Sequence, residues 1–228
     1  MADLLKDGLL KLNFSQEDAD RICPLMEKYI NELRLFNSAY NLVNTDDHDE
    51  VVVRHILDSL CACKKIEALA NECVSKKGSV VIGDIGSGGG LPGIPLAASL
   101  PQFNFVLVER MSKRCAFLEN CAAILGLKNV SVKNVEAERV EKESIDIAVF
   151  RAFRPLDKKM IKTLLNMLPS GGKLAAYKAK KEKITEEMSA INYDENSYKV
   201  EPLEVPFLTD TENDARERNL VIVEKLIG

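Results

Sequence analysis

A glycine-rich segment that directly follows a short run of β-branched residues constrains the fold of this chain more than any other feature. Residues 79–84 read SVVIGD and favour a strand, residues 84–93 read DIGSGGGLPG, and a helix-length segment covers residues 92–100. In a doubly wound α/β fold, the loop between the first strand and the first helix binds nucleotide-like ligands. Four glycines within positions 86–90 let the backbone pass close to such a ligand. The segment therefore predicts a ligand-binding α/β domain.

The rest of the chain after this loop alternates between strand-like and helix-like segments. Further strands are expected over residues 103–109, 130–132, 145–150 and 173–178, and further helices over residues 112–125 and 156–168. This alternation implies right-handed crossovers and a mostly parallel, doubly wound sheet that is covered on both faces. A helix near residues 181–191 and two more strands, over residues 198–205 and 219–226, complete the expected domain.

The N-terminal part of the chain carries helical patterns and no strand pattern. Ser15, followed by Glu17 and Asp18, is typical of a helix start, and Pro24 is expected to bend or restart this helix. Turn-forming residues over 40–47 precede a second amphipathic stretch over residues 50–70. We therefore expect a helical N-terminal extension over residues 1–70 and one α/β domain over residues 71–228.

Length and composition exclude several classes of protein. The chain has 228 residues, enough for one full domain with an appendage, and 31 Lys and Arg against 35 Asp and Glu give a net charge of −4. The most apolar stretch, residues 91–100, contains two prolines and a glycine and is too short to cross a membrane. The first residues lack the layout of a signal peptide, so a cytoplasmic protein is expected. The six cysteines form no CxxC pair, and we expect no metal site.

Two acidic residues narrow the choice of ligand. Asp84 precedes the first loop glycine, and Glu109 ends the next strand, where a carboxylate can accept hydrogen bonds from both hydroxyls of a ribose. That arrangement serves NAD and S-adenosylmethionine alike, and Gly88-x-Gly90-x-x-Gly93 also satisfies the dinucleotide pattern. A dehydrogenase would need a substrate domain, for which the chain has little room. The spacing Asp84-x-Gly86-x-Gly88-x-Gly90 resembles the first motif of the Rossmann-like S-adenosylmethionine-dependent methyltransferases. The paired terminal strands of those enzymes, one of them antiparallel, suit the C-terminal end of this chain.

A closer resemblance rests on several blocks that occur in order between about residue 36 and residue 180. They are residues 41–43 (NLV), 54–60 (RHILDSL), 86–95 (GSGGGLPGIP), 113–118 (KRCAFL) and 151–153 (RAF). In these blocks the chain resembles the RsmG family, also called glucose-inhibited division protein B. The resemblance implies a 16S ribosomal RNA methyltransferase that places a methyl group from S-adenosylmethionine on N7 of a guanine. It further implies that the small ribosomal subunit or its RNA is the partner, and we expect a monomer.

The resemblance also implies a set of cofactor contacts, which are Gly86, Leu91, Ala137, Glu138 and Arg151. Together with Asp84, Gly88 and Glu109 they form the predicted cofactor site. These positions are physically reasonable because they follow the carboxyl ends of parallel strands, where open α/β sheets bind ligands. The alternatives are a solvated charge for Glu138 and a surface ion pair for Arg151.

The implied reaction needs no general base, because N7 of guanine carries an exposed lone pair at neutral pH. Catalysis can rest on alignment, and we expect no acid/base pair among the side chains. The candidates for positioning the target base are Arg151, Lys178, His55 and Asn41. The alternative for His55 is a buried helix histidine hydrogen-bonded to a neighbour such as Asp58.

Two basic clusters are candidates for contacts to RNA phosphates. The first is Arg151, Arg154, Lys158, Lys159 and Lys162, and the second is Lys173, Lys178, Lys180, Lys181 and Lys183. Arg110, Lys113 and Arg114 extend them, and the candidates for stacking on a base are Phe153 and Tyr177. The alternatives to an RNA methyltransferase are a methyltransferase acting on another acceptor, a non-catalytic ribosome-assembly factor and, more remotely, an NAD oxidoreductase.

Overall fold

The computed structural model describes residues 4–151, 156–193, 197–209 and 216–226. Its centre is a seven-stranded sheet in the order β3-β2-β1-β4-β5-β7-β6, in which β7 alone runs antiparallel to its two neighbours. This arrangement confirms the predicted mostly parallel sheet with an antiparallel C-terminal strand. The strands are β1 (Val81–Ile85), β2 (Asn104–Glu109), β3 (Val130–Asn134), β4 (Ile147–Arg151), β5 (Lys173–Lys178), β6 (Lys199–Pro202) and β7 (Asn219–Glu224).

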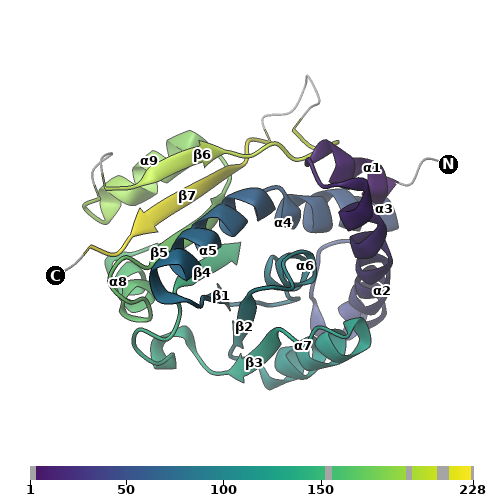
Figure 1. Cartoon of the computed structure of the whole chain (residues 1–228), viewed down its shortest axis with the longest axis horizontal. Coiled ribbons are helices and arrows are strands. Elements are labelled where there is room, and N and C mark those ends of the chain that lie inside the picture. Colours follow the sequence, from purple (N-terminus) through teal and green to yellow (C-terminus); the bar gives the residue numbers. More distant parts are fainter. Residues whose placement is uncertain (1–3, 152–155, 194–196, 210–215, 227–228) are drawn as a thin grey trace.

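Helices cover both faces of this sheet (Figure 1). One face carries α5 (Cys63–Lys77), α6 (Gly93–Ser99) and α7 (Ser112–Leu125), and the other carries η2 (Ala137–Arg139), α8 (Lys158–Asn166) and α9 (Lys181–Ala190). Alternating residues of the central strands enter the two cores: Ile147 and Val149 pack with the first group, and Ala148 and Phe150 pack with the second. The strands are apolar on both sides because both sides are buried.

Five further elements precede α5 along the described part of the chain. They are α1 (Leu4–Lys11), α2 (Gln16–Tyr40), α3 (His48–Val51), the π-helical segment η1 (Val52–Leu57) and the short α4 (Asp58–Leu60) that continues it. As predicted, Ser15 caps the start of α2, where its hydroxyl accepts the backbone N–H of Asp18 at 3.0 Å. Of the bend or restart expected at Pro24, the restart is wrong, because α2 runs through this residue. Burial of Ile22, Met26 and Tyr29 on the core side of α2 offsets the hydrogen bond that a proline cannot donate.

The N-terminal helices and the sheet share one apolar core. Tyr29, Ile30 and Leu33 of α2 lie in the same buried cluster as Ile82 of β1 and Leu107 of β2. The helix α2 packs against both α6 and α7. The division of the chain near residue 70 stays a prediction, since these helices are bound to the α/β layer by continuous apolar packing. No helix in the described ranges combines the length and apolar character needed to cross a membrane.

Tight packing at the start of α6 leads to a first prediction. A Cβ on Gly93 would lie 2.6 Å from Oδ2 of Asp84 and would also collide with Leu107. We expect Gly93→Ala to lower the free energy of unfolding by about 1 to 3 kcal/mol, because the close contact forces α6 away from β1 and β2. Urea denaturation followed by circular dichroism measures this change.

Ser99→Ala, at the other end of α6, is the matched control. The hydroxyl of Ser99 is buried and has no hydrogen-bond partner among the described residues, so its removal is expected to leave stability unchanged or slightly higher. Equal losses in the two variants would contradict the packing argument at Gly93.

Candidate functional site

The glycine loop between β1 and α6 forms one wall of the candidate site. Gly88 and Gly90 adopt left-handed backbone angles, with φ of 58° and 92°, that residues with a Cβ rarely adopt. The backbone N–H groups of Gly86 and Ser87 donate to the carbonyl oxygen of Val108 at 2.9 and 3.0 Å, which ties the loop to the end of β2. An added Cβ on Gly88 would approach only the carbonyl of Gly86 at 3.9 Å and the Arg114 guanidinium at 4.0 Å. The space in front of Gly88 is therefore open.

Two buried carboxylates hold this loop from behind. One oxygen of Asp84, which is 1% exposed, accepts the hydroxyl of Ser87 and the backbone N–H of Gly93, the latter at 3.1 Å. Glu109 accepts the backbone N–H of Gly88 at 3.0 Å with one oxygen and that of Met111 at 2.8 Å with the other. Both predicted cofactor-site acids therefore bind the backbone of the protein, although each oxygen of Glu109 retains a second lone pair.

A cavity of about 820 Å³ opens in front of the loop. Parts of the chain that are far apart in sequence line it: the turn after α2, the segment η1 with α4, the glycine loop, the carboxyl ends of β4 and β5, and the residue before β7. The lining residues are Asn41, Leu42, Val43, Asn44, Arg54, His55, Asp58, Gly86, Ser87, Gly88, Gly89, Leu91, Arg114, Phe150, Arg151, Tyr177, Lys178, Ala179 and Arg218.

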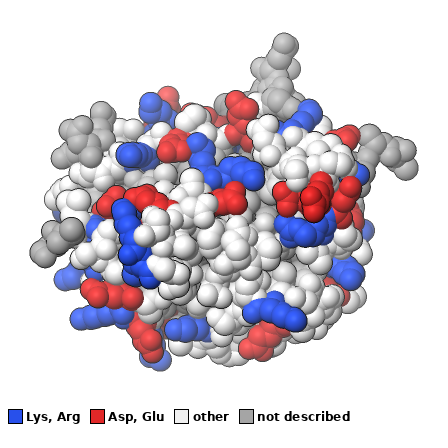
Figure 2. Space-filling model, in the orientation of Figure 1, with Lys and Arg blue, Asp and Glu red and all other residues white. Residues whose placement is uncertain are grey.

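Positive charge is concentrated in this cavity. Its lining contains five cationic side chains, those of Arg54, Arg114, Arg151, Lys178 and Arg218, and one carboxylate, that of Asp58. The whole chain, in contrast, has a net charge of −4. On the face shown in Figure 2, Lys and Arg side chains lie interspersed with Asp and Glu side chains. The cavity can therefore attract an anionic ligand although the protein as a whole cannot.

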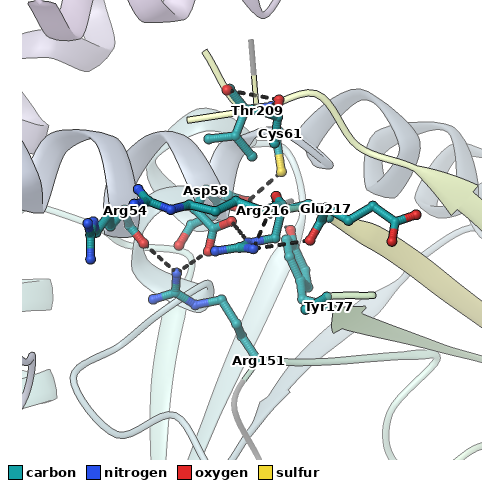
Figure 3. A network of polar contacts seen from close by, with 12 residues as sticks. Arg54, Asp58, Cys61, Arg151, Tyr177, Thr209, Arg216 and Glu217 are labelled. Atoms are coloured by element: carbon teal, nitrogen blue, oxygen red, sulfur yellow. Dashed lines mark hydrogen bonds and ion pairs between the residues drawn. The ribbon is translucent and has the colours of Figure 1, made fainter. Parts of the chain in front are cut away.

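Asp58, which lines this cavity, lies at the centre of the polar network shown in Figure 3. One of its oxygens accepts Nη1 of Arg151 at 2.5 Å and the other accepts Nε of Arg218 at 2.8 Å. Arg151 also donates to the backbone carbonyl of Arg54 at 3.0 Å, and the hydroxyl of Tyr177 donates to the carbonyl of Ser59 at 2.8 Å. The network joins η1 and α4 to the ends of β4 and β5 and to the start of β7.

His55 is a neutral member of the same cavity wall. Burial, assisted by the nearby Arg151 cation, lowers the pKa of His55 to about 4. Its Nδ1 lies 3.3 Å from Nη2 of Arg151, which can only donate, and its Nε2 lies 3.2 Å from Oδ1 of Asn44. The network thus assigns the proton of the neutral imidazole to Nε2. The anticipated partner Asp58 is engaged by the two arginines instead.

The structure brings most of the predicted site residues together. Seven of them line the cavity: Asn41, His55, Gly86, Gly88, Leu91, Arg151 and Lys178. Asp84 and Glu109 lie behind the glycine loop, as described above. Ala137 and Glu138 lie in η2, between two residues that line a separate cavity of about 500 Å³, Glu136 and Arg139. Met111 lines this second cavity as well and directly contacts Glu109 through its backbone N–H.

The residues of the second predicted basic cluster do not all lie at the cavity. Lys173 is the first residue of β5, is 6% exposed and pairs with Glu72 of α5 at 3.1 Å, so its predicted place at the cleft is wrong. Lys178, at the other end of β5, reaches the cavity and pairs with Glu187 at 2.8 Å. Lys183 pairs with Glu186 on the surface of α9. Phe153 and Arg154 lie outside the described residues.

Arg218, which lines the cavity and contacts Asp58, was not among the predicted site residues. No motif surrounds this residue, and the contact spans 160 positions of the chain. One indication was available. If the last strand runs antiparallel, the residue that precedes it lies at the edge of the sheet where the parallel strands end. Arg218 is that residue, since β7 begins at Asn219.

The strand order, the glycine loop after β1 and the cavity at the carboxyl edge define a Rossmann-like methyltransferase fold. The structure of the tRNA methyltransferase TrmI from Aquifex aeolicus is similar, with a TM-score of 0.53 over 75% of this chain and 69% of that one; at 18% identity, the likeness shows the fold alone. A family model described as rRNA small subunit methyltransferase G matches residues 22–221. The chain belongs to this family, which the resemblance noted above had indicated.

Two relatives illustrate the family. Ribosomal RNA small subunit methyltransferase G of Treponema denticola is 40% identical over 98% of this chain and 96% of its own length. The protein of the same name from Treponema pallidum is 37% identical over 90% of this chain and 88% of its own length. The similarity thus extends over nearly the full length of the chain, including the N-terminal helices.

The buried carboxyl of Asp84 leads to a second prediction. Burial raises the pKa of Asp84 from 3.8 to about 6, so the folded protein binds this proton more tightly than the unfolded chain. The stability that results is present below pH 4 and is lost as the pH rises through 6. Relative to Asp84→Asn, which does not titrate, the cofactor-free wild type is expected to lose about 2 kcal/mol between pH 4 and 6, out of about 3 kcal/mol over the whole transition.

Urea denaturation of both proteins at closely spaced pH values measures this difference. Because every other titrating group is common to the two proteins, the difference isolates Asp84. A difference in unfolding free energy that stays constant over this pH range would show that the buried carboxyl titrates as it does in the unfolded chain.

Proposed function

We propose that this protein transfers a methyl group from S-adenosylmethionine to N7 of a guanine in the 16S RNA of the small ribosomal subunit. Membership of the rRNA small subunit methyltransferase G family supports the reaction class. The observation that carries the proposal is the cavity itself, in which the glycine loop and five cationic side chains meet. A site for a nucleoside-containing cofactor and a site for a polyanion are thereby joined.

The chain offers a suitable place for the cofactor. The loop glycines have left-handed backbone angles, and the space in front of Gly88 is open. A ligand can therefore approach the loop backbone in space that a side chain would otherwise fill. Gly86, Gly88 and Leu91 are the residues to hold the amino-acid portion, and Glu109 has lone pairs left for the ribose hydroxyls. We assign Ala137 and Glu138 to the adenine side. When bound, S-adenosylmethionine supplies an electrophilic methyl group on a positively charged sulfur.

The chain's own residues then have to orient the guanine and exclude water. Arg151 is held by Asp58 and by the carbonyl of Arg54, so it forms a fixed wall of the cavity. An arginine bound to both O6 and N7 would block the reacting nitrogen, which favours a single donor such as Lys178 or Asn41 as the contact to O6. Alignment of this kind can lower the barrier by about 7 to 11 kcal/mol without any proton transfer.

Incubation of the purified protein with S-adenosylmethionine and small-subunit RNA, followed by mass mapping, tests the proposal directly. We expect a single methylated guanine. Gly88→Ala and Gly126→Ala form a matched pair, because both glycines have left-handed φ but only Gly88 lines the cavity. Gly88→Ala is expected to weaken cofactor binding in calorimetry by about tenfold or more, a loss of at least about 1.4 kcal/mol, and Gly126→Ala to leave it unchanged. Methylation of another atom, or none, would contradict the proposal.

The rate of methyl transfer is expected to be independent of pH between 6.5 and 8.5. His55 stays neutral throughout this range because burial and Arg151 lower its pKa to about 4, and guanine N7 needs no deprotonation. Single-turnover kinetics at saturating RNA and cofactor measure the rate, with His55→Asn as the comparison. An ionisation near pH 6 to 7 that disappears in His55→Asn would show that this histidine takes part in proton transfer.

A further inference from the structure

Asp58 binds two guanidinium groups that come from two different strands at the same edge of the sheet. Asp58 is 4% exposed, and each of its carboxylate oxygens accepts from a different arginine, Arg151 at the end of β4 and Arg218 just before β7. One carboxylate between two guanidiniums leaves a net positive charge on the wall of the cavity. The cost of burying the carboxylate is offset only while both ion pairs keep good geometry, so the arrangement fixes where the two guanidiniums lie.

The Arg218 guanidinium is held in place through Nε and Nη1, whereas its Nη2 group remains available for a ligand. Nε donates to Asp58 at 2.8 Å, and Nη1 donates to the backbone carbonyls of Arg216 and Glu217 at 3.3 and 3.1 Å. Nη2 has no hydrogen-bond partner among the residues that the structure describes. A guanidinium whose orientation is fixed by hydrogen bonds on one edge, and which keeps a free N–H donor group, is pre-organised to bind an anion.

Arg218 also stands where two cavities meet. It lines the 820 Å³ cavity and a second one of about 500 Å³, whose charged lining consists of three cations and three carboxylates: Lys180, Arg216, Arg218, Glu182, Glu204 and Glu217. A substrate that is a chain must extend beyond the pocket that holds its reacting unit. The neighbouring cavity gives such a chain a path away from the target base, and Arg218 lies at the connection.

The position of Arg218 separates it from the proposed cofactor contacts. In the sheet order β1-β4-β5-β7, its backbone lies three strand spacings from the glycine loop, roughly 14 Å away. The amino-acid carboxylate of a cofactor seated on that loop would therefore lie near Arg151 before it lay near Arg218. The anion for Arg218 must come from the other ligand of the cavity.

We propose that Arg218 binds a phosphodiester group of the RNA chain next to the methylated nucleotide, with Asp58 as the positioning residue that holds it in place. The proposal rests on the proposed function, since it assigns part of the RNA to a part of the same site. A purely structural role, in which Asp58 and Arg218 only join α4 to β7, is the alternative. The two roles differ in one measurable quantity, the number of counterions released when RNA binds.

The experiment measures the affinity for a 16S RNA fragment by fluorescence anisotropy between 50 and 300 mM salt. Loss of one phosphate contact reduces the magnitude of the slope of log Kobs against log salt by about 0.7 to 0.9. We expect this reduction in Arg218→Ala and in Asp58→Asn, and no further reduction in the double variant, because Asp58 acts on this phosphate through Arg218. Cofactor affinity of Arg218→Ala, measured by calorimetry, is expected to equal that of the wild type.

Arg21→Ala is the matched control. Arg21 also donates to two backbone carbonyls, those of Ala98 and Ser99 at 2.8 and 3.3 Å, but it lines neither of the two cavities that meet at Arg218. Its removal is expected to lower stability without changing the salt slope. Thermal unfolding of all variants accompanies the titrations, and if Asp58→Asn does not fold, Arg218→Ala alone decides.

Three outcomes are informative. An unchanged slope in Arg218→Ala, in a protein that methylates RNA, overturns this proposal and leaves the proposed function intact. A loss of cofactor affinity with an unchanged slope also overturns it and assigns Arg218 to the cofactor. A wild type that neither binds nor methylates the RNA overturns the proposed function, and this proposal with it.

Discussion

The hydrogen bonds from the glycine loop to the carboxylates of Asp84 and Glu109 are the constraint on which the rest of the site depends. A loop of glycines has no side chains with which to hold its own shape, and its buried N–H groups must find acceptors. Asp84 binds Ser87 and Gly93, and Glu109 binds Gly88. The hydroxyl of Tyr29, from α2, donates to the carbonyl of Gly89 on the other side. With its backbone fixed from both sides, the loop can present open space to a ligand without collapsing into it.

Asp58 fixes the cationic side chains of the cavity, as Asp84 and Glu109 fix the backbone of the glycine loop. Its carboxylate ties together the last residue of β4 and the residue before β7, and its backbone lies directly after the π-helical segment η1. A π-helical turn is wider than an α-helical one and often occurs at functional sites. Here it lies beside the cavity and carries Arg54 and His55, both of which line that cavity. The N-terminal helices are therefore part of the site as well as part of the core.

The features that the sequence predicted are those set by local pattern. The helix over residues 112–125 and the mostly parallel sheet followed from apolar spacing and alternation, and α7 has the predicted bounds. The glycine loop was predicted from its residue types alone, four glycines directly after a strand-like run. The features that were missed depend on pairs far apart in the chain: Arg218 reaches Asp58 across 160 positions, and Lys173 is drawn to Glu72 at the opposite edge of the sheet from the cavity. A charge run gives no information about which end of a strand each lysine occupies. The π-helical break at residues 52–57 has the same composition as an ordinary amphipathic helix.

The residues of the cavity wall come from two sources, the common α/β fold and the N-terminal segment that precedes it. The α/β layer supplies the glycine loop and the ends of β4 and β5, whereas Asn41, Asn44, Arg54, His55 and Asp58 come from the segment between α2 and α5. A fold shared with a tRNA methyltransferase at 18% identity cannot by itself decide which acceptor is methylated. On the proposed function, the loop side holds the cofactor and the added segment faces the RNA. Asp58 then joins the two sides, because Arg151 lies beside the proposed cofactor contacts and Arg218 lies toward the neighbouring cavity. Acceptor choice in this protein would thus depend on how the N-terminal helices are fastened to the sheet.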